Sequence, residues 1–497
     1  MQKFLAAIYI LFIGLVNTVD ASDTVVMKYP DGSIYTGELK EGLRNGKGTY
    51  TLPSGYKYSG DWVLGEIQGT GEANFPDGSV YKGSFVQGMP NGSGKVVFAD
   101  GGFYEGELVK GNIDGMGLLT SSSGGIYIGL FSDSLYNGKG SLTNSDGYNY
   151  TGDWLAGVRH GFGKITFKDG SVYEGSIERD IRSGNGKLIF YNKKGEKYEY
   201  DGNWADDQFH GEGILLYPDG NKYSGYFKNG RRDGRGKIEY NNGDIYEGNF
   251  VDDQRNGEGS FFRSDGFSFE GSWVNGKMEG EGKITYPDGS LYLGRVVREL
   301  PDGFGKLIYK DGSGYTGDWV SGKIQGIGEA NFSDGSVYRG SFLLGVPEGF
   351  GKVVFKDGRV YEGQFKNSLY DGFGEISDPS GYTYKGNWRD GTPEGKGLSV
   401  YSNGTSYEGS YKDGQRHGIG ELKEGSGFRY IGEWVKGVIE GIGLLEYSSG
   451  AIYEGSLKVG KRHGKGTMTY PNNEVASGIW EYGRLQDATN RLIPKDD

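Results

Sequence analysis

Four histidines are the side chains of this sequence best suited to hold a metal ion or to transfer a proton near neutral pH. They are His160, His210, His417 and His463. Each stands directly before a glycine-x-glycine triplet, and the four lie in widely separated segments. Metal ligands must converge on one ion, so this pattern favours four equivalent turn positions over a metal or catalytic site.

Two other patterns resemble catalytic motifs and are explained better in another way. The segment 91–95, NGSGK, is similar to a phosphate-binding loop, but Val96 stands where such a loop needs Ser or Thr. Carboxylate pairs such as Glu105 and Glu107 recur along the chain, as expected for a solvated sheet face. We therefore predict no catalytic residue, no metal and no cofactor.

The composition indicates ordered β structure without conventional globular cores. Among 497 residues there are 96 glycines, and only 35% of residues are hydrophobic. The 38 Tyr, 25 Phe and 8 Trp distinguish the chain from a disordered glycine-rich segment. The absence of cysteine excludes disulfides and thiolate sites. The net charge of −12 opposes binding to nucleic acid or to an anionic membrane surface.

The N-terminus has the features of an export signal. Lys3 gives a positive start, residues 4–16 form a short apolar run, and residues 19–21 provide a cleavage site. We expect residues 1–21 to be a signal peptide cleaved after Ala21, and the protein to be periplasmic or secreted, with association with the cell envelope as one form of this localisation. The apolar run has 13 residues, fewer than the ~20 that a membrane helix needs, and an uncleaved anchor is the alternative.

A 23-residue repeat organises the rest of the chain. Each repeat begins with a Y-x-G motif whose aromatic residue we define as position 0 and call the anchor. Only the step from Tyr173 to Tyr200 differs, being 27 residues, and we expect its four extra residues to lengthen the loop near 192–196. The anchors are Tyr35, Tyr58, Tyr81, Tyr104, Tyr127, Tyr150, Tyr173, Tyr200, Tyr223, Tyr246, Phe269, Tyr292, Tyr315, Tyr338, Tyr361, Tyr384, Tyr407, Tyr430 and Tyr453.

The positions within each repeat predict a β-hairpin with one aromatic and one polar face. Glycine occupies +2, +11 and +13 in all nineteen repeats, and every tryptophan stands at +4. Alternate residues of a strand share a face, so the anchor, +2 and +4 point one way and +1 and +3 the other. We expect the three glycines to leave room on the aromatic face for large rings.

Turns and end units define the domain boundaries. Segments such as Pro76-Asp77-Gly78 join one repeat to the next, and the turn within each repeat has Gly or, in six repeats, another residue at +7. Residues 22–34 match the second half of a repeat, and Gly478, Trp480 and Gly483 match the first half. We predict an N-terminal half-repeat cap at 22–34, a repeat array at 35–474, and a C-terminal partial repeat and tail at 475–497.

These repeats resemble MORN repeats, the membrane occupation and recognition nexus motif. Residues 453–471, YEGSLKVGKRHGKGTMTYP, match the family pattern Y-E-G-x-W-x-x-G-x-x-H-G-x-G almost residue for residue. The resemblance covers about residues 27–483. It implies an all-β fold, an elongated and twisted single-layer antiparallel sheet in a rod-like array. It also implies roles in protein contacts, membrane tethering or lipid association, and no catalytic residues.

The aromatic face is the candidate functional surface. We predict a non-enzymatic scaffold that binds protein partners, with homodimerisation across this face as one form of association. A module that binds envelope glycans or lipids is the alternative, since tryptophans stack on sugar rings. No nucleic-acid partner is expected. The candidate binding-face residues are Trp62, Trp154, Trp204, Trp273, Trp319, Trp388 and Trp434.

Overall fold

A computed structural model describes residues 24–492 of the chain, and their regular elements are all β-strands. Residues 1–23, which hold the expected signal peptide, lie outside the described part. The chain divides into two compact units, Met1–Gln254 and Arg255–Asp497. None of the described residues forms a helix that could cross a membrane.

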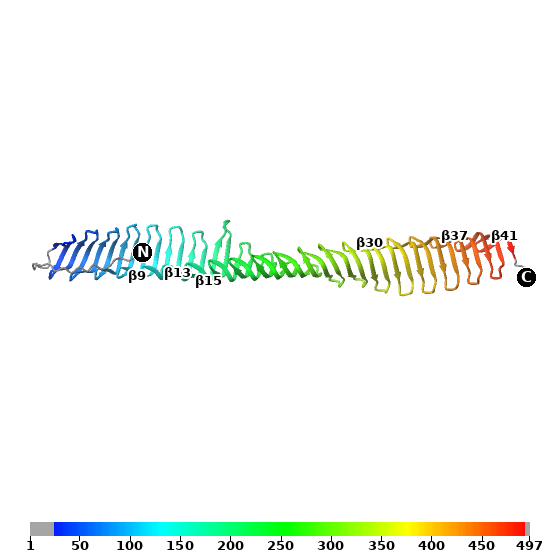
Figure 1. The fold of residues 1–497 in the computed structure, drawn as a ribbon, viewed down its shortest axis with the longest axis horizontal. Helices are drawn as coiled ribbons and strands as arrows, with labels where there is room; N and C mark the ends of the chain where they lie inside the picture. The colour runs from blue at the N-terminus through cyan, green and yellow to red at the C-terminus, as the bar shows by residue number, and fades with distance from the viewer. Residues whose placement is uncertain (1–23, 493–497) are drawn as a thin grey trace. The chain divides into compact units, whose positions relative to one another are not determined.

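The first unit contains twenty strands that follow one another in sequence order (Figure 1). They are β1 (Val25–Lys28), β2 (Ile34–Lys40), β3 (Leu43–Thr51), β4 (Lys57–Val63), β5 (Glu66–Asn74), β6 (Val80–Val86), β7 (Met89–Val97), β8 (Phe103–Val109), β9 (Asn112–Thr120), β10 (Ile126–Ser132), β11 (Leu135–Thr143), β12 (Asn149–Leu155), β13 (Val158–Thr166), β14 (Val172–Glu178), β15 (Ile181–Tyr191), β16 (Lys197–Ala205), β17 (Gln208–Leu216), β18 (Lys222–Lys228), β19 (Arg231–Glu239) and β20 (Ile245–Val251).

The strands of the second unit alternate between short and long in the same way. They are β21 (Gln254–Phe262), β22 (Ser268–Val274), β23 (Lys277–Thr285), β24 (Leu291–Val297), β25 (Leu300–Ile308), β26 (Gly314–Val320), β27 (Lys323–Asn331), β28 (Val337–Leu343), β29 (Val346–Val354), β30 (Val360–Lys366), β31 (Leu369–Ser377), β32 (Thr383–Arg389), β33 (Thr392–Val400), β34 (Ser406–Lys412), β35 (Gln415–Lys423), β36 (Arg429–Val435), β37 (Val438–Glu446), β38 (Ile452–Lys458), β39 (Lys461–Thr469), β40 (Val475–Glu481) and β41 (Arg484–Leu492).

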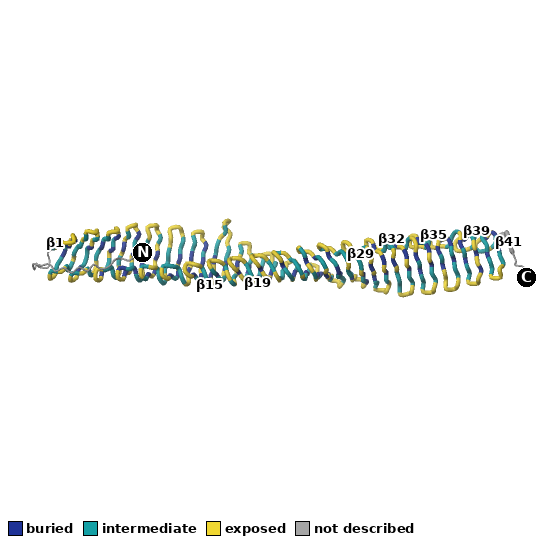
Figure 2. The backbone as a smooth tube through the Cα atoms, viewed as in Figure 1, coloured by how far each residue is buried: buried dark blue, intermediate teal, exposed yellow. Residues whose placement is uncertain are grey.

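Within each unit, consecutive strands pair antiparallel, so each repeat is a hairpin that also pairs with its neighbouring repeats. The pair β6–β7, for example, joins Tyr81 to Val96 within a repeat. The pair β7–β8 then joins Val96 to Tyr104 of the next repeat. Buried residues alternate with more exposed ones along the strands, and the exposed residues gather at the turns (Figure 2). The predicted all-β antiparallel sheet of hairpin repeats is confirmed.

Two glycines of each repeat make room for the anchor ring. An added Cβ on Gly94, at +13, would lie 2.3 Å from Cε2 of Tyr81, and one on Gly83, at +2, 2.4 Å from the tyrosine hydroxyl. The ring thus lies directly on bare backbone, and Tyr81 is completely buried. Its hydroxyl donates a hydrogen bond to the Ser84 carbonyl oxygen at 2.8 Å, which satisfies the one polar atom in this contact.

The third glycine, at +11, has a different role from the one expected. It lies in a β-bulge, because the pairing shifts between +2 and +4, and its φ is positive throughout, as at Gly69 with +97°. A Cβ there would meet the side chain at +3, such as Asp61, on the polar face. The expectation that the +11 glycine leaves room on the aromatic face is therefore wrong, because the bulge directs this residue toward the polar face.

The residue at +3 closes the bulge. Asp61 accepts a hydrogen bond from the backbone N–H of Thr70, at +12, over 2.9 Å. Asp318 accepts one from Ile327 N–H in the same way, at 2.9 Å. These bonds satisfy the backbone donor at +12, next to the bulged residue.

The turn within each repeat has left-handed backbone at both central residues. Gln87 and Gly88, at +6 and +7, have φ values of 49° and 80°, the combination that a type I′ hairpin turn requires. Six repeats lack the +7 glycine and keep φ between 62° and 70° all the same. These residues are Ser134, Asp180, Asp207, Asp253, Glu299 and Ser368.

The four extra residues after Tyr173 lengthen strands and leave the loop unchanged. β15 has 11 residues and β16 has 9, with the added pairs Phe190–Tyr198 and Tyr191–Lys197. The turn keeps its usual hydrogen bond, from Asn192 N–H to the Glu196 carbonyl at 3.1 Å. The expected longer loop is wrong, because pairing two residues on each strand satisfies backbone groups that a loop would leave to water. This hairpin projects beyond its neighbours (Figure 1).

The two ends of the array continue the same pairing. β1 pairs with β2 through Met27 and Tyr35, in the register that joins one repeat to the next. At the other end β41 pairs with β40, although the sequence after Gly483 does not follow the repeat. The sheet therefore extends through residues that the sequence predicted to be a tail.

A glycine substitution tests the contact between anchor and backbone. Gly94→Ala should lower the local free energy of opening by about 3 kcal/mol, because its methyl group would overlap the buried Tyr81 ring. Gly88→Ala is the matched control. The added Cβ would meet no atom within 4 Å, so this substitution costs only about 1 kcal/mol, which comes from its left-handed φ. Hydrogen exchange of residues 81–97 measures both, and equal effects would contradict the proposed contact.

Candidate functional site

The aromatic face is a packed layer in which each +4 ring lies between two anchors. Trp62 meets Tyr35 of the preceding repeat and Tyr58 of its own, at centroid distances of 5.4 and 5.5 Å. Interplanar angles of 80° and 81° make both contacts edge-on, the arrangement that aromatic quadrupoles favour. Anchors and +4 side chains thus form one continuous row along each unit.

The seven predicted binding tryptophans all belong to this row. They are 2–8% exposed, so the layer covers their ring faces. Six donate an indole N–H to the carbonyl oxygen of the preceding +13 glycine, as Trp204 does to Gly186 at 2.9 Å. The indole nitrogen of Trp434 is buried with no hydrogen-bond partner among the described residues. A role in binding for Trp62, Trp154, Trp204, Trp273, Trp319, Trp388 and Trp434 stays a prediction.

Side chains at +9 cover the outer side of this aromatic row. The Arg182 guanidinium lies 4.3 Å from the centroid of Trp204 and 5.7 Å from that of Tyr173. Its Nε also donates to Asp207 at 2.8 Å. In other repeats an aromatic residue takes this place, as Tyr370 does on Tyr361 at 3.6 Å. Arginine at +9 therefore adds cation–π contacts and an ion pair to the packing.

A second aromatic row, at +17, remains partly open. Its members follow the long strands and lean against the residue at +21 of a neighbouring turn, as Phe75 does on Tyr56 at 5.6 Å. Phe75 and Phe98 are half-buried, and Tyr309 is 44% exposed. This row, rather than the tryptophans, offers accessible ring surface on the aromatic face.

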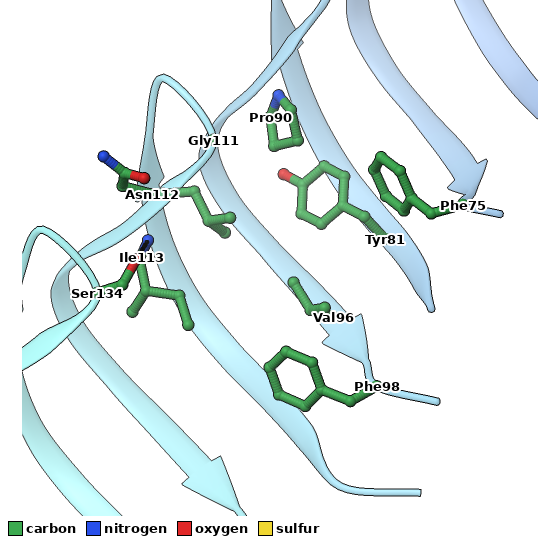
Figure 3. A pocket seen from close by; sticks show the side chains of 10 residues that line it. Phe75, Tyr81, Pro90, Val96, Phe98, Gly111, Asn112, Ile113 and Ser134 are labelled. Carbon is green, nitrogen blue, oxygen red and sulfur yellow. Dashed lines mark hydrogen bonds between the residues drawn. The ribbon is translucent and has the colours of Figure 1, made fainter. Parts of the chain in front are cut away.

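An apolar hollow lies beside the +17 row in the first unit (Figure 3). Phe75, Tyr81 and Phe98 border it on one side, and the +7 turns close the other. It occurs where the +4 residue is the small Leu108 and the +9 residue is proline. Its full lining is Phe75, Tyr81, Pro90, Val96, Phe98, Leu108, Gly111, Asn112, Ile113 and Ser134.

A hollow in the second unit has an equivalent position. It is bordered by Tyr286 and Tyr309, both at +17, and by Ile324 at +9. The turn residue Gly322, at +7, closes it as Gly111 closes the first. The two hollows thus lie at the same repeat positions, although the second has Trp319 at +4 and Ile324 at +9.

The residues considered first for catalysis do not come together. In the described residues, no three His, Asp or Glu side chains form a group that could hold a metal ion. His160, His210, His417 and His463 lie in β13, β17, β35 and β39, at the bulge and not in a turn as expected. Glu105 lies on the solvated face, where it meets Lys95 at 3.4 Å.

A comparison with protein families matches the MORN repeat to nineteen segments of the sequence. Together they span most of residues 35–475. The chain belongs to the MORN repeat family. The matched segments are 35–55, 58–80, 81–103, 104–126, 127–147, 150–172, 173–194, 200–222, 223–245, 246–267, 269–291, 292–314, 315–337, 338–358, 361–381, 384–406, 407–426, 430–452 and 453–475. MORN repeats generally form non-catalytic scaffolds, and the predicted family is confirmed.

Comparison of the MORN array with solved structures returns distant likenesses. The TCP10 domain of Danio rerio CPAP is 16% identical, with 40% of this chain and 93% of that chain covered and a TM-score of 0.24. A TCP domain of Drosophila melanogaster SAS-4, in complex with a proline-rich motif of Ana2, is 16% identical over 41% and 90%, with a TM-score of 0.18. Such TM-scores are too low to bear on fold or function. No curated protein matches the chain.

The sequence interpretation missed one surface of the MORN array. Position +12 faces solvent on the side opposite the aromatic layer, and eleven of the nineteen repeats hold a polar residue there. Four consecutive repeats of the second unit instead hold Phe304, Ile327, Phe350 and Phe373, all exposed. The signal was present as an apolar residue between the glycines of the G-x-G triplet.

Burial of the anchors makes the MORN array sensitive to alkaline pH. Desolvation raises the pKa of Tyr81, Tyr104 and Tyr338 to about 12 from the ordinary 10.0. The folded state thus favours the neutral phenol, whereas the unfolded chain ionises near 10. The stabilisation that comes from burying the anchors as neutral phenols is fully present below pH 10 and is lost as the pH rises through 12.

We therefore expect the array to unfold between about pH 10 and 12, with anchor ionisation and loss of β structure in the same transition. Ultraviolet absorbance of tyrosinate and circular dichroism, recorded on the same samples, measure the two events. Ionisation of all tyrosines near pH 10 with the sheet intact would show that the anchors are accessible to water.

Proposed function

We propose that this chain is an exported, non-enzymatic MORN scaffold that binds extended segments of partner proteins along its aromatic face. The observation that carries the proposal is the groove between the +17 aromatic row and the +7 turns. Its hollows lie at equivalent repeat positions in the two units. Partly buried aromatic rings provide large contact area, which suits them to anchor a partner.

The repeat adds multivalency to this groove. Aromatic residues occupy +17 in thirteen of the nineteen repeats, so a partner with several apolar side chains would contact several repeats at once. Weak contacts that are linked in this way gain avidity without any single strong site. The lining of the first hollow is mainly apolar, which favours apolar peptide side chains over polyhydroxylated sugars.

Export is the second part of the proposal. It rests on Lys3, the apolar run at 4–16 and the small residue at the expected cleavage site, Ala21. The protein purified from its native host should therefore begin at Ser22, as read by mass spectrometry of its N-terminal peptide. Retention of residues 1–21 would contradict cleavage. Recovery only in the cytosolic fraction would contradict export itself.

Groove variants test the binding proposal. Phe75→Ser combined with Phe98→Ser removes two half-buried rings beside the first hollow and should reduce recovery of bound proteins from native extracts by about tenfold. Quantitative mass spectrometry after mild crosslinking measures the recovery. Both rings follow strands and are not anchors, so circular dichroism should show an intact sheet.

Phe162→Ser is the matched control. Phe162 is 55% exposed on the opposite face, so its replacement changes hydrophobicity by a similar amount without touching the groove. Equal loss of partners in the control and in the groove variant would overturn the assignment to the groove. Binding of isolated envelope glycans with no protein partner would overturn the proposal as a whole.

A further inference from the structure

The buried aromatic layer of the second unit departs from the repeat at one place. Position +15 holds an apolar or aromatic side chain in eighteen repeats and a serine, Ser399, in the remaining one. Position +4 of the following repeat holds Tyr411, the one tyrosine found at +4 in the sequence. Both side chains are buried, and their hydroxyls form a hydrogen bond with each other. A polar pair therefore lies where the other repeats pack apolar side chains and rings.

Two further tyrosines bring hydroxyl groups to this pair from the outer edge of the layer. Tyr382, at +21, interacts with the same Ser399 hydroxyl. Tyr401, at +17, lies against Tyr382, with the two ring centroids 5.1 Å apart. Both tyrosines are half-buried and occupy repeat positions that border the protein-binding groove.

An arginine completes the group. Arg416, at +9, donates a hydrogen bond from Nη2 to the Tyr401 hydroxyl at 3.2 Å. Its guanidinium also lies over the rings of Tyr407 and Trp434, 4.8 and 5.1 Å from their centroids. These ring contacts hold the planar side chain in place and leave its other N–H groups available. We call this group the Arg416 site; its members are Tyr382, Ser399, Tyr401, Tyr411 and Arg416.

Arg416 lacks the partners that other arginines at +9 have at the next +7 turn. Arg182 donates from Nε to the carboxylate of the aspartate at that turn, at 2.8 Å. Arg44 and Arg462 donate to the carbonyl oxygen of the glycine there, at 2.9 and 2.7 Å. After Arg416 the +7 residue is Gly437, and in the described part of the chain Arg416 forms no ion pair. Its charge is therefore not neutralised by a carboxylate.

The Arg416 site has more hydrogen-bond donors than acceptors. Tyr411 and Ser399 can donate in sequence toward Tyr382, which leaves the Tyr382 O–H to donate outward. Tyr401 accepts from Arg416, so its own O–H is left for another acceptor. Burial raises the pKa of Tyr382 above the ordinary 10.0, and its hydroxyl is therefore protonated at neutral pH. Two O–H groups beside an arginine without an ion pair make a receptor for an anion.

We propose that the Arg416 site binds the carboxylate of an Asp or Glu side chain in the partner segment that lies along the groove. Arg416 is the counter-ion, and the Tyr382 and Tyr401 hydroxyls are further donors. A carboxylate matches the guanidinium, which donates two parallel N–H bonds to it. The inference rests on the proposed function and adds one chemical feature of the partner.

Neighbouring charges favour a single carboxylate over a multiply charged anion. The +17 positions on either side of Tyr401 are acidic, Asp378 and Glu424. Asp378 accepts hydrogen bonds from two backbone N–H groups of its own turn, which fixes its carboxylate there. A phosphate group or a polyanionic surface would be repelled by both acidic residues, whereas one side-chain carboxylate contacts Arg416 alone.

The Arg416 site gives the groove a register. Aromatic rings at +17 offer similar apolar contacts in many repeats, so they do not fix which repeat a segment occupies. The serine at +15 and the tyrosine at +4 occur beside an arginine at +9 once in the sequence. A carboxylate that is buried away from Arg416 would lose its hydration without gaining a partner. The segment therefore binds best where its acidic residue meets this site.

Peptide selection on the full chain tests the inference. The probe is a library of random linear peptides displayed with a fused C-terminus, so that every carboxylate belongs to a side chain. The wild type should enrich peptides that combine apolar residues with one Asp or Glu. Arg416→Ile should lower the enrichment of acidic residues about tenfold and leave the apolar preference unchanged. Isoleucine suits this position, since +9 is isoleucine in four other repeats, at Ile67, Ile113, Ile324 and Ile439.

Arg232→Ile is the matched control. Arg232 also stands at +9, but its Nε pairs with Asp253 at 3.1 Å, so the acidic preference should survive this change. Arg416→Glu should replace the preference for Asp and Glu with one for Lys and Arg.

The outcomes separate this inference from the proposed function. Selection of purely apolar peptides by the wild type would overturn the carboxylate site and leave the groove in place as a binding surface. An acidic preference that survives Arg416→Ile would overturn the assignment to Arg416. A wild type that selects no peptide at all would overturn both the site and the groove.

Discussion

The stability of this single-layer sheet depends on one contact, the anchor ring lying flat on the backbone of two glycines. A sheet without a second layer cannot bury large side chains between layers, so its rings must find cover within the sheet itself. Removing Cβ at +2 and +13 brings each ring against bare backbone, and the ring buries completely, as Tyr35 and Tyr58 show. The +4 and +9 side chains then close the remaining sides. The aromatic layer thus serves as the core of the protein.

Much of this packing could be predicted from the sequence, because the same pattern of anchors and glycines occurs in all nineteen repeats. The period indicated the hairpins, the anchors indicated the buried face, and the glycines at +2 and +13 indicated the close approach of ring and backbone. The bulge could not be predicted, because period-two counting assumes an unbroken strand and therefore placed Gly69 on the wrong face. The inserted residues near Asn192 were misplaced for a related reason, since sequence spacing does not tell a longer loop from two longer strands.

The candidate site was only partly visible from the sequence. Tryptophan is rare and has a large apolar ring, so the sequence favoured these residues as the binding surface. Packing between anchors nevertheless covers Trp62 and its equivalents. Whether an aromatic ring is accessible to solvent depends on whether a neighbouring side chain packs over it, and the three-dimensional packing of the sheet decides this. The half-buried +17 row and the exposed apolar side chains at +12 became apparent only when burial was known. Both surfaces use residues that the hairpin does not need.

That separation explains how one repeat can serve several contacts. The folding contacts lie on one face and are local to each hairpin and its neighbour, so position +12 is free to vary without effect on the core. Lysine, glutamate, phenylalanine and isoleucine all occur there, on strands of the same geometry. Four consecutive apolar residues between Glu281 and Lys396 therefore contribute nothing that the hairpins require.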